Sequence, residues 1–187
     1  MLVPILITLA IILACFIIIV AMRPSDFRVT RSTTVDAPGE RVFEQVNELR
    51  NWEAWSPWAK LDPNAKATYE GPSAGVGAAF AWSGNSKIGE GRMTITESRP
   101  KELVRFKLDF VKPFKGTNTA EFTFQPEGRQ TVVQWTMFGK CNFIAKAFGL
   151  FVNCDKMVGA QFEKGLAELK LLAEAAATTQ QAQSRAA

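Results

Sequence analysis

The chain contains no histidine among its 187 residues. This absence excludes Ser–His and Cys–His nucleophile pairs, histidine-ligated zinc and imidazole acid–base chemistry. Only three cysteines are present, Cys15, Cys141 and Cys154, and no two of them form a Cys-x-x-Cys pair. Because this spacing lacks a metal or redox motif, we expect Cys141 and Cys154 to be small buried side chains. The sequence predicts no metal site and no cofactor.

Basic charge is also sparse. The chain has 22 Lys and Arg against 18 Asp and Glu, a net charge of +4, and the basic residues are spread rather than grouped. Nucleic-acid-binding surfaces carry a basic stripe with interleaved aromatic residues, so nucleic acid is not an expected partner. Aromatic residues, in contrast, are numerous, with 14 Phe and 5 Trp beside a single Tyr. Such apolar bulk suits either a dense core or a lined cavity.

An apolar run extends from Leu2 to Met22, interrupted only by Pro4 and Thr8. About 20 residues at about 1.5 Å each span the hydrocarbon core of a bilayer. A secretory signal peptide is the alternative interpretation. Against it, no Lys or Arg precedes the run and no small-x-small cleavage site follows it. We therefore predict a single-pass transmembrane anchor over residues 1–22.

The basic residues nearest this run all follow it, at Arg23, Arg28 and Arg31. By the positive-inside bias, the rest of the chain is expected on the cytoplasmic side of the membrane. Residues 23–26 alone separate the run from the first strand pattern, so we expect the folded domain to work against the membrane surface.

From Phe27 onward, short segments alternate apolar and polar residues and are separated by Gly and Pro turns, which is typical of strands. Consecutive strands joined by short turns form an antiparallel sheet. The expected strands cover residues 27–35, 66–70, 77–82, 88–97, 102–111, 117–125 and 131–138. The expected short helices cover residues 41–49 and 143–152.

The longest helical pattern covers Asp155–Ala173, with Asp155 as its expected N-cap. Its apolar residues recur at steps of three and four, at Val158, Phe162, Leu166, Leu169 and Leu172. This helix is the one long partner available to bury the apolar face of the sheet. The predicted fold class is therefore α+β, a curved antiparallel sheet wrapped around a long C-terminal helix. We place this domain at residues 27–173 and expect a disordered tail at residues 174–187.

Three motifs point to a known family. They are Val35-Asp36-Ala37-Pro38 before Val42-Phe43, the segment from Trp52 to Trp55-Ser56-Pro57-Trp58, and Phe162-Glu163-Lys164-Gly165-Leu166. With them the chain resembles the START-like superfamily, often called SRPBCC, in its polyketide cyclase/dehydrase branch. The resemblance covers about residues 27–173. It implies a helix-grip fold with a hydrophobic cavity between sheet and last helix, reached through loops at one end, but it supplies no catalytic motif.

The expected ligand-binding residues are mostly aromatic. Trp52, Trp55 and Trp58 could pack one end of the sheet, form the rim of a pocket, or lie at the bilayer interface. The other candidates are inward-facing positions of the strands and the long helix: Trp82, Met93, Phe106, Phe110, Phe122, Trp135, Met137, Phe162 and Leu166. In a small domain such a set usually forms a solid core, but one helix facing a wide sheet leaves room for a pocket.

Acid–base candidates are few. Glu90 and Arg92 share a strand face with Thr94, and could either enter the cavity or form ion pairs outside it. By the same alternation, Asp109 and Glu121 are expected to point to water. Tyr69 is the one further candidate near such a pocket. A carboxylate enclosed in an apolar cavity would have a raised pKa and could transfer protons.

These patterns favour a membrane-anchored domain that binds a hydrophobic small molecule, a lipid or lipid-like metabolite. The loop at residues 112–116 and the segment at 143–152 would admit the ligand. The alternative is a polyketide cyclase/dehydratase-type enzyme that uses an acid–base residue in the same cavity. A third possibility is a structural domain with a filled core. No pattern specifies an oligomeric state.

Overall fold

The computed structural model describes residues 2–186 of the chain. Its centre is a seven-stranded antiparallel sheet in the order β1-β7-β6-β5-β4-β3-β2, as predicted for an α+β domain. The strands are β1 (Asp26–Val35), β2 (Lys66–Glu70), β3 (Ala79–Ser83), β4 (Glu90–Arg99), β5 (Leu103–Lys112), β6 (Gly116–Glu127) and β7 (Gln130–Lys140). The helices are α1 (Leu2–Met22), α2 (Gly39–Asn47), α3 (Trp52–Trp55), α4 (Phe143–Phe148) and α5 (Cys154–Ala186), with a 3₁₀ turn at Leu49–Asn51.

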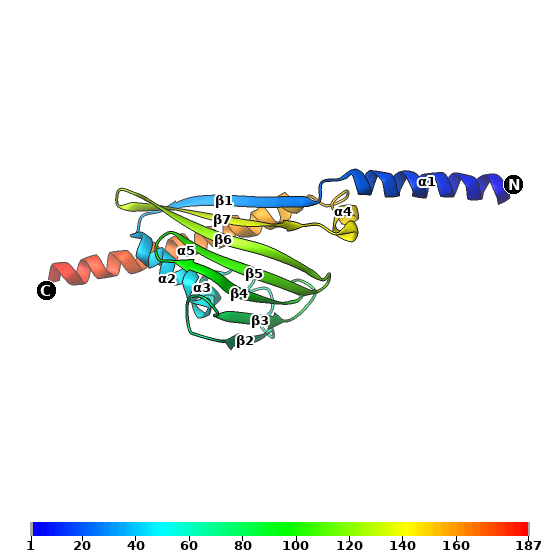
Figure 1. Ribbon diagram of the computed structural model, residues 1–187. Coiled ribbons are helices and arrows are strands. Elements are labelled where there is room, and N and C mark those ends of the chain that lie inside the picture. The colour runs from blue at the N-terminus through cyan, green and yellow to red at the C-terminus, as the bar shows by residue number, and fades with distance from the viewer. Residues whose placement is uncertain (1, 187) are drawn as a thin grey trace.

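Alternate residues of each strand face α5, and we call this side of the sheet the inner face (Figure 1). Trp135 of β7 identifies it, because its indole stacks on Phe162 of α5 with ring centroids 4.1 Å apart. The strand register extends this face across the sheet. One row of paired residues on it consists of Val29, Met137, Ala120, Phe106 and Ile95.

Two ends of the sheet can be distinguished in Figure 1. At the near end, β1 begins at Asp26 directly after α1, and α4 lies beside the last turn of α1. At the far end, β1 leads into α2, and the β6–β7 hairpin turns at Gly128, whose φ of +64° is accessible to glycine. Helix α2 covers the far end with three buried apolar side chains, Val42, Phe43 and Val46.

Helix α5 approaches the sheet closely because it carries a glycine at position 165. A Cβ added there would lie 2.9 Å from both Pro57 Cδ and Trp135 Cζ3, which real Cβ atoms essentially never show. On either side of Gly165, Phe162, Leu166 and Leu169 are buried against the sheet. The apolar stripe read from the sequence is therefore the packed face of this helix.

The two ends of α5 differ from the sequence-based expectation. Asn153 caps the helix, with its Oδ1 accepting from the Lys156 N–H at 3.0 Å, and Asp155 lies inside the first turn. Asn is as good an N-cap as Asp. Asp155 forms an ion pair with Arg31 of β1 instead. At the other end, the helix continues to Ala186, beyond the Ala173 limit expected from the pattern, because this stretch is rich in alanine, the strongest helix former.

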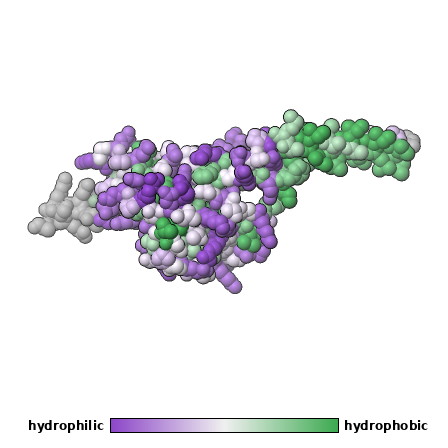
Figure 2. All heavy atoms as spheres, viewed as in Figure 1, coloured by the Kyte–Doolittle hydropathy of each residue, from purple (hydrophilic) through white to green (hydrophobic). Residues whose placement is uncertain are grey.

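Helix α1 projects away from the domain and is apolar along its whole length (Figures 1 and 2). It has 21 residues and a mean hydropathy of 3.3 over its most apolar window, with Val20 the buried residue. At about 1.5 Å per residue it is about 31 Å long, close to the hydrocarbon thickness of a bilayer. It is therefore long and apolar enough to span a membrane.

Candidate functional site

An aromatic cluster fills the middle of the space between the inner face and α5. Trp135 is 2% exposed and lies between Phe162 of α5 and Phe122 of β6, with ring centroids at 4.1 and 4.7 Å. Trp52 and Trp55 of α3 pack edge-on against the same Trp135 ring, at 5.9 and 5.8 Å. These contacts place five of the residues expected to bind a ligand in one packed group.

The three tryptophans near α3 have different environments. Trp52 and Trp55 are buried, and their indole N–H groups donate to the backbone oxygens of Val46 and Gln45, at 2.9 and 3.2 Å. Trp58 is half-buried at the edge of the cluster, 5.7 Å from the Trp135 ring. Trp52 and Trp55 are thus packed side chains, and Trp58 packs on Trp135 and Phe162 while remaining partly exposed.

One polar atom inside the cluster has no partner. The indole Nε1 of Trp135 is buried and makes no hydrogen bond within the described part of the chain. An unsatisfied buried donor carries a desolvation cost of about 1–3 kcal/mol. Among the described residues, this Nε1 is the one buried side-chain polar atom found without a partner.

Burial on the inner face changes from one end to the other. At the far end and in the middle, the side chains of Val104, Phe106, Phe122 and Val133 are completely buried. At the near end, most apolar side chains are only half-buried, whereas Met93, which pairs with Leu108, is buried. The half-buried ones are Phe27, Phe80, Trp82, Leu108 and Phe110, and Met137 in the adjoining row is half-buried too.

The half-buried residues include three of the predicted ligand-binding positions, Trp82, Phe110 and Met137. Met93 lies on the same face and is buried, as is Leu166 on α5. Trp82 is held in place by its indole N–H, which donates to the Ile88 oxygen at 3.0 Å. The near end of the inner face is thus a fixed apolar surface that α5 covers incompletely.

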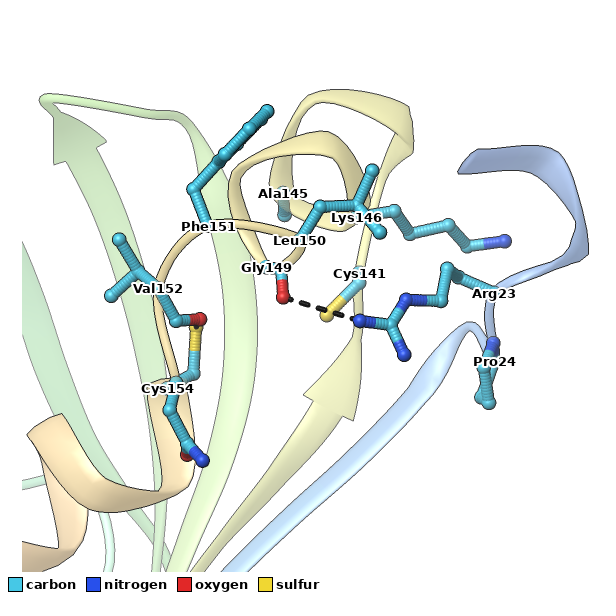
Figure 3. A pocket seen from close by; sticks show the side chains of 11 residues that line it. Arg23, Pro24, Cys141, Ala145, Lys146, Gly149, Leu150, Phe151, Val152 and Cys154 are labelled. Atoms are coloured by element: carbon cyan, nitrogen blue, oxygen red, sulfur yellow. Dashed lines mark hydrogen bonds between the residues drawn. The ribbon is translucent and has the colours of Figure 1, made fainter. Parts of the chain in front are cut away.

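A recess of about 530 Å³ opens at the foot of α1 (Figure 3). Its walls come from the linker between α1 and β1, the residue that follows β7, α4, the loop before α5 and the first residue of α5. They are Arg23, Pro24, Cys141, Ala145, Lys146, Gly149, Leu150, Phe151, Val152, Asn153 and Cys154. The volume lies within the range of about 300–1,000 Å³ of small-molecule sites.

Arg23 crosses this recess, and its Nη2 donates to the Gly149 oxygen at 3.4 Å. Cys141 is half-buried and Cys154 is exposed, so the expectation of two buried thiols is wrong for Cys154. Burial raises the pKa of the Cys141 thiol and keeps it protonated. Within residues 2–186, no group of three metal-ligating side chains is found.

Ion pairs join α5 to the edge strand β1. Arg31, an inner-face residue of β1, donates from Nε to Glu163 at 2.7 Å and from Nη2 to Asp155 at 3.1 Å. The hydrogen bond from Arg31 lowers the pKa of the Asp155 carboxyl. Gly159 lies beneath the guanidinium, where any side chain would collide with it. The helix is therefore held over the sheet by charge at its near end and by packing further along.

The two weak catalytic candidates lie outside this space. Arg92 forms an ion pair with Glu70 at 2.9 Å, and Glu90 forms one with Lys112 at 2.8 Å. By the strand register, Arg92 lies on the face of β4 opposite to Met93, which is the outer face. Both residues share that face, as their alternation indicated, and both are paired there.

The other acid–base candidates also have structural partners. Asp109 accepts from the Thr117 hydroxyl at 2.7 Å, which lowers the pKa of its carboxyl. Glu121 accepts from Arg105 at 3.1 Å. Tyr69 is half-buried, and desolvation raises the pKa of its phenol. The lowered pKa of Asp109 keeps it ionised, the raised pKa of Tyr69 keeps it protonated, and Glu121 is held in an ion pair.

Comparison with known proteins identifies the fold. The structure of protein CV1439 from Chromobacterium violaceum superposes with a TM-score of 0.57 at 17% identity, covering 81% of this chain and 99% of that one. Protein Ms6760 from Mycobacterium smegmatis gives 0.55 at 19% identity, with 80% and 92% covered. At these identities the likeness shows the fold alone.

The di-domain ARO/CYC protein StfQ of the steffimycin biosynthetic pathway gives a TM-score of 0.60 at 13% identity. The match covers 82% of this chain and 52% of StfQ, so this chain spans about half of that protein. These neighbours confirm the helix-grip fold that the resemblance implied. Comparison with curated proteins gives no match.

A family model matches residues 26–174, from the first strand to the packed part of the last helix. Its description is polyketide cyclase / dehydrase and lipid transport. The match includes all seven strands and all three sequence motifs that carried the resemblance. It also includes the near end of the inner face. The chain therefore belongs to the polyketide cyclase / dehydrase and lipid transport family.

Proposed function

We propose that this protein is a membrane-anchored domain that binds a hydrophobic small molecule, a lipid or lipid-like metabolite. The observation that carries the proposal is the change of burial along the inner face. Apolar side chains are closed off at the far end, yet toward the near end Trp82, Phe110 and Met137 remain half-buried on the inner face. An apolar ligand that covered these side chains would gain about 25 cal/mol for each Å² removed from water.

The anchor supports a ligand drawn from the membrane. Helix α1 is long and apolar enough to span a bilayer, and only Arg23, Pro24 and Ser25 separate it from β1. The half-covered end of the inner face is the end next to α1 (Figure 1). A ligand leaving the bilayer beside the anchor would reach these side chains first. By the positive-inside bias of Arg23 and Arg28, the domain lies on the cytoplasmic side.

Three features of the space favour binding over catalysis. Glu90 and Arg92 are paired on the outer face, away from the proposed ligand. The carboxylates that meet Arg31 serve to hold α5 against β1. The indole N–H of Trp135 in the packed cluster is a hydrogen-bond donor only and cannot accept a proton.

Native mass spectrometry of the full-length protein, released from its membrane in mild detergent, tests this proposal. We expect a co-purified apolar molecule whose class is identified after organic extraction. The variant Phe110→Ala should lose most of it, since Phe110 belongs to the half-covered surface. Phe138→Ala is the matched control, because Phe138 is a half-buried phenylalanine whose ring lies under Arg28 on the outer face.

A wild-type protein that carries no apolar molecule, and that also fails to bind a fluorescent fatty acid, would overturn the binding function. If Phe110→Ala and Phe138→Ala lose equal amounts of the co-purified molecule, the ligand is not bound at the inner face. Turnover of a polyketide-like substrate that Glu90→Gln abolishes would instead favour the cyclase alternative.

A further inference from the structure

The β5–β6 loop and the segment of α4 with the loop after it expose large apolar side chains at the near end. We call this set the apolar tip: Phe114, Phe143, Ile144, Phe148 and Phe151. Phe151 is 81% exposed, Ile144 59% and Phe114 55%. Phe114 comes from the β5–β6 hairpin, yet its ring lies 6.4 Å from that of Phe148, so two segments far apart in the sequence form one surface.

The apolar tip lies at the foot of α1. Helix α4, which carries Phe143, Ile144 and Phe148, contacts α1 directly. The Arg23 side chain, one residue past α1, binds the Gly149 oxygen and so ties α4 and the following loop to the anchor. Figure 3 shows the Phe151 ring pointing away from the recess. In Figure 1, α4 lies next to the end of α1, where a bilayer spanned by α1 would have its surface.

Charge around the apolar tip is strongly of one sign. Residues 111–116 and 140–157 contain five lysines, namely Lys112, Lys115, Lys140, Lys146 and Lys156. The same segments contain one acidic residue, Asp155, and Arg31 already neutralises it. Glu90 from β4 pairs with Lys112. Asp26 of β1 lies opposite Lys140. The other lysines of these segments flank the apolar tip in sequence, and this composition is typical of sites that bind anionic lipid headgroups.

We propose that the apolar tip inserts into the interfacial region of an anionic bilayer, forming a second membrane contact beside α1. This inference rests on the proposed membrane anchor and deepens it. Aromatic rings are favoured at the boundary between headgroups and acyl chains, and each lysine gains from the negative surface potential. A domain held at two points cannot swing freely on its short linker, so its half-covered inner face stays directed at the lipid.

Site-directed spin labelling of the full chain tests the docking. The native cysteines are replaced by alanine, and single labels are placed by Phe151→Cys, Ile12→Cys and Arg129→Cys. Ile12 lies in α1, and Arg129 is an exposed residue in the β6–β7 turn at the far end. The protein is reconstituted into phosphatidylcholine vesicles containing phosphatidylglycerol. Collision rates with oxygen and with a water-soluble nickel chelate then report the depth of each label.

We expect the labels at positions 151 and 12 to collide more often with oxygen than with the nickel chelate. The label at position 129 should collide more often with the nickel chelate. If position 151 behaves like position 129 while position 12 remains in lipid, docking is overturned and the anchor stands. If position 12 is also aqueous, anchor and docking are overturned together. If the label at position 151 is shielded from both reagents, another protein or a second copy covers the tip, and membrane docking is wrong.

Charge provides a second readout. In vesicles of phosphatidylcholine alone, the label at position 151 should become more accessible to nickel. Lys115→Gln and Lys146→Gln should each lower the ratio of docked to undocked domain about fivefold in anionic vesicles, because a lysine near such a surface contributes about 1 kcal/mol. Lys66→Gln is the control, since this lysine lies in the edge strand β2, outside the two loops of the apolar tip. Equal depth for all variants and both vesicles would overturn the role of anionic lipid.

Discussion

The near and far ends of the domain are built from the same sheet but are closed in different ways. At the far end, α2 inserts Val42, Phe43 and Val46, and the strand side chains beneath it are fully buried. At the near end, the inner face remains half-covered and the loops expose aromatic rings. The far end therefore has the properties of a closed core, and the near end is where the proposed ligand would bind. Under this proposal, stability and binding would depend on opposite ends of one sheet.

Loss of the central indole should have the largest effect on this contrast. Trp135→Ala removes a fully packed ring, and we expect the free energy of unfolding to fall by about 3–5 kcal/mol. Phe110→Ala at the near end should cost much less, because part of that ring is already in water. Denaturant unfolding followed by circular dichroism measures both. Similar losses of unfolding free energy for the two variants would mean that Phe110 at the near end belongs to the core as fully as Trp135 does.

Gly165→Ala tests the close approach of α5. Alanine is the better helix former by about 1 kcal/mol, but its Cβ would collide with Pro57 and Trp135. We expect the collision to dominate, with a net loss of about 1–3 kcal/mol as in other overpacked cores. Ala167→Gly, at an exposed position of the same helix, should lose only the difference in helix propensity. A more stable Gly165→Ala protein would contradict the tight fit.

Acid should weaken the ion pair that joins the near end of α5 to β1. The folded-state pKa of Asp155 lies below its ordinary value, so its ion pair with Arg31 stabilises the fold above that value and is lost as pH falls through the folded pKa. Melting temperatures measured from neutral pH down to below about pH 4 should therefore drop.

The control for this pH effect is Asp155→Asn, which cannot ionise. Its melting temperature should be lower at neutral pH and should change less on acidification than that of the wild type. Glu174, whose pKa is lowered by a hydrogen bond from the Asp36 N–H and by Lys170, contributes in the same direction and remains in this variant. An identical pH profile for variant and wild type would exclude Asp155 as a source of the effect.

Changes at the apolar tip should affect stability least. Phe151 is almost fully exposed, so Phe151→Ser should change the free energy of unfolding by less than about 0.5 kcal/mol. Its effect should appear only in the membrane. There, a spin label placed on the apolar tip by Ile144→Cys should lie at a shallower depth in the bilayer. A large loss of stability in detergent would instead assign Phe151 a structural role.

Much of the fold could be read from residue patterns. All seven strands occur within three residues of their expected limits, because a side-chain period of two is visible wherever one face of a strand is buried. The stripe from Phe162 to Leu169 marks the packed face of α5 for the same reason, at a period of 3.6. Helix ends were less accurate, since Asn153 and Asp155 are equally good caps and only the position of Arg31 separates their roles.

The candidate site was less predictable. Alternation placed Trp82, Phe110 and Met137 on the inner face together with Phe106 and Phe122, and no local pattern distinguishes the half-buried group from the buried one. The alternation of β1 places Arg31 on the same face as the apolar residues, so an inward-facing charge could be predicted from the sequence. Its partners could not, because they lie more than 120 residues away. Such pairings depend on how α5 crosses the sheet.

The sequence by itself determined a long apolar N-terminal helix, an antiparallel sheet and a long packing helix, because each follows from local periodicity or composition. Its motifs also carried the resemblance to the helix-grip family. Only the tertiary structure decided which end of the inner face is left half-covered, and that Phe114 meets Phe148 beside the anchor. The physical reason is that burial and surface continuity depend on the positions of segments distant in the chain. Near α1, α5 is held to the edge strand by ion pairs, and most apolar side chains of the inner face there stay half-buried.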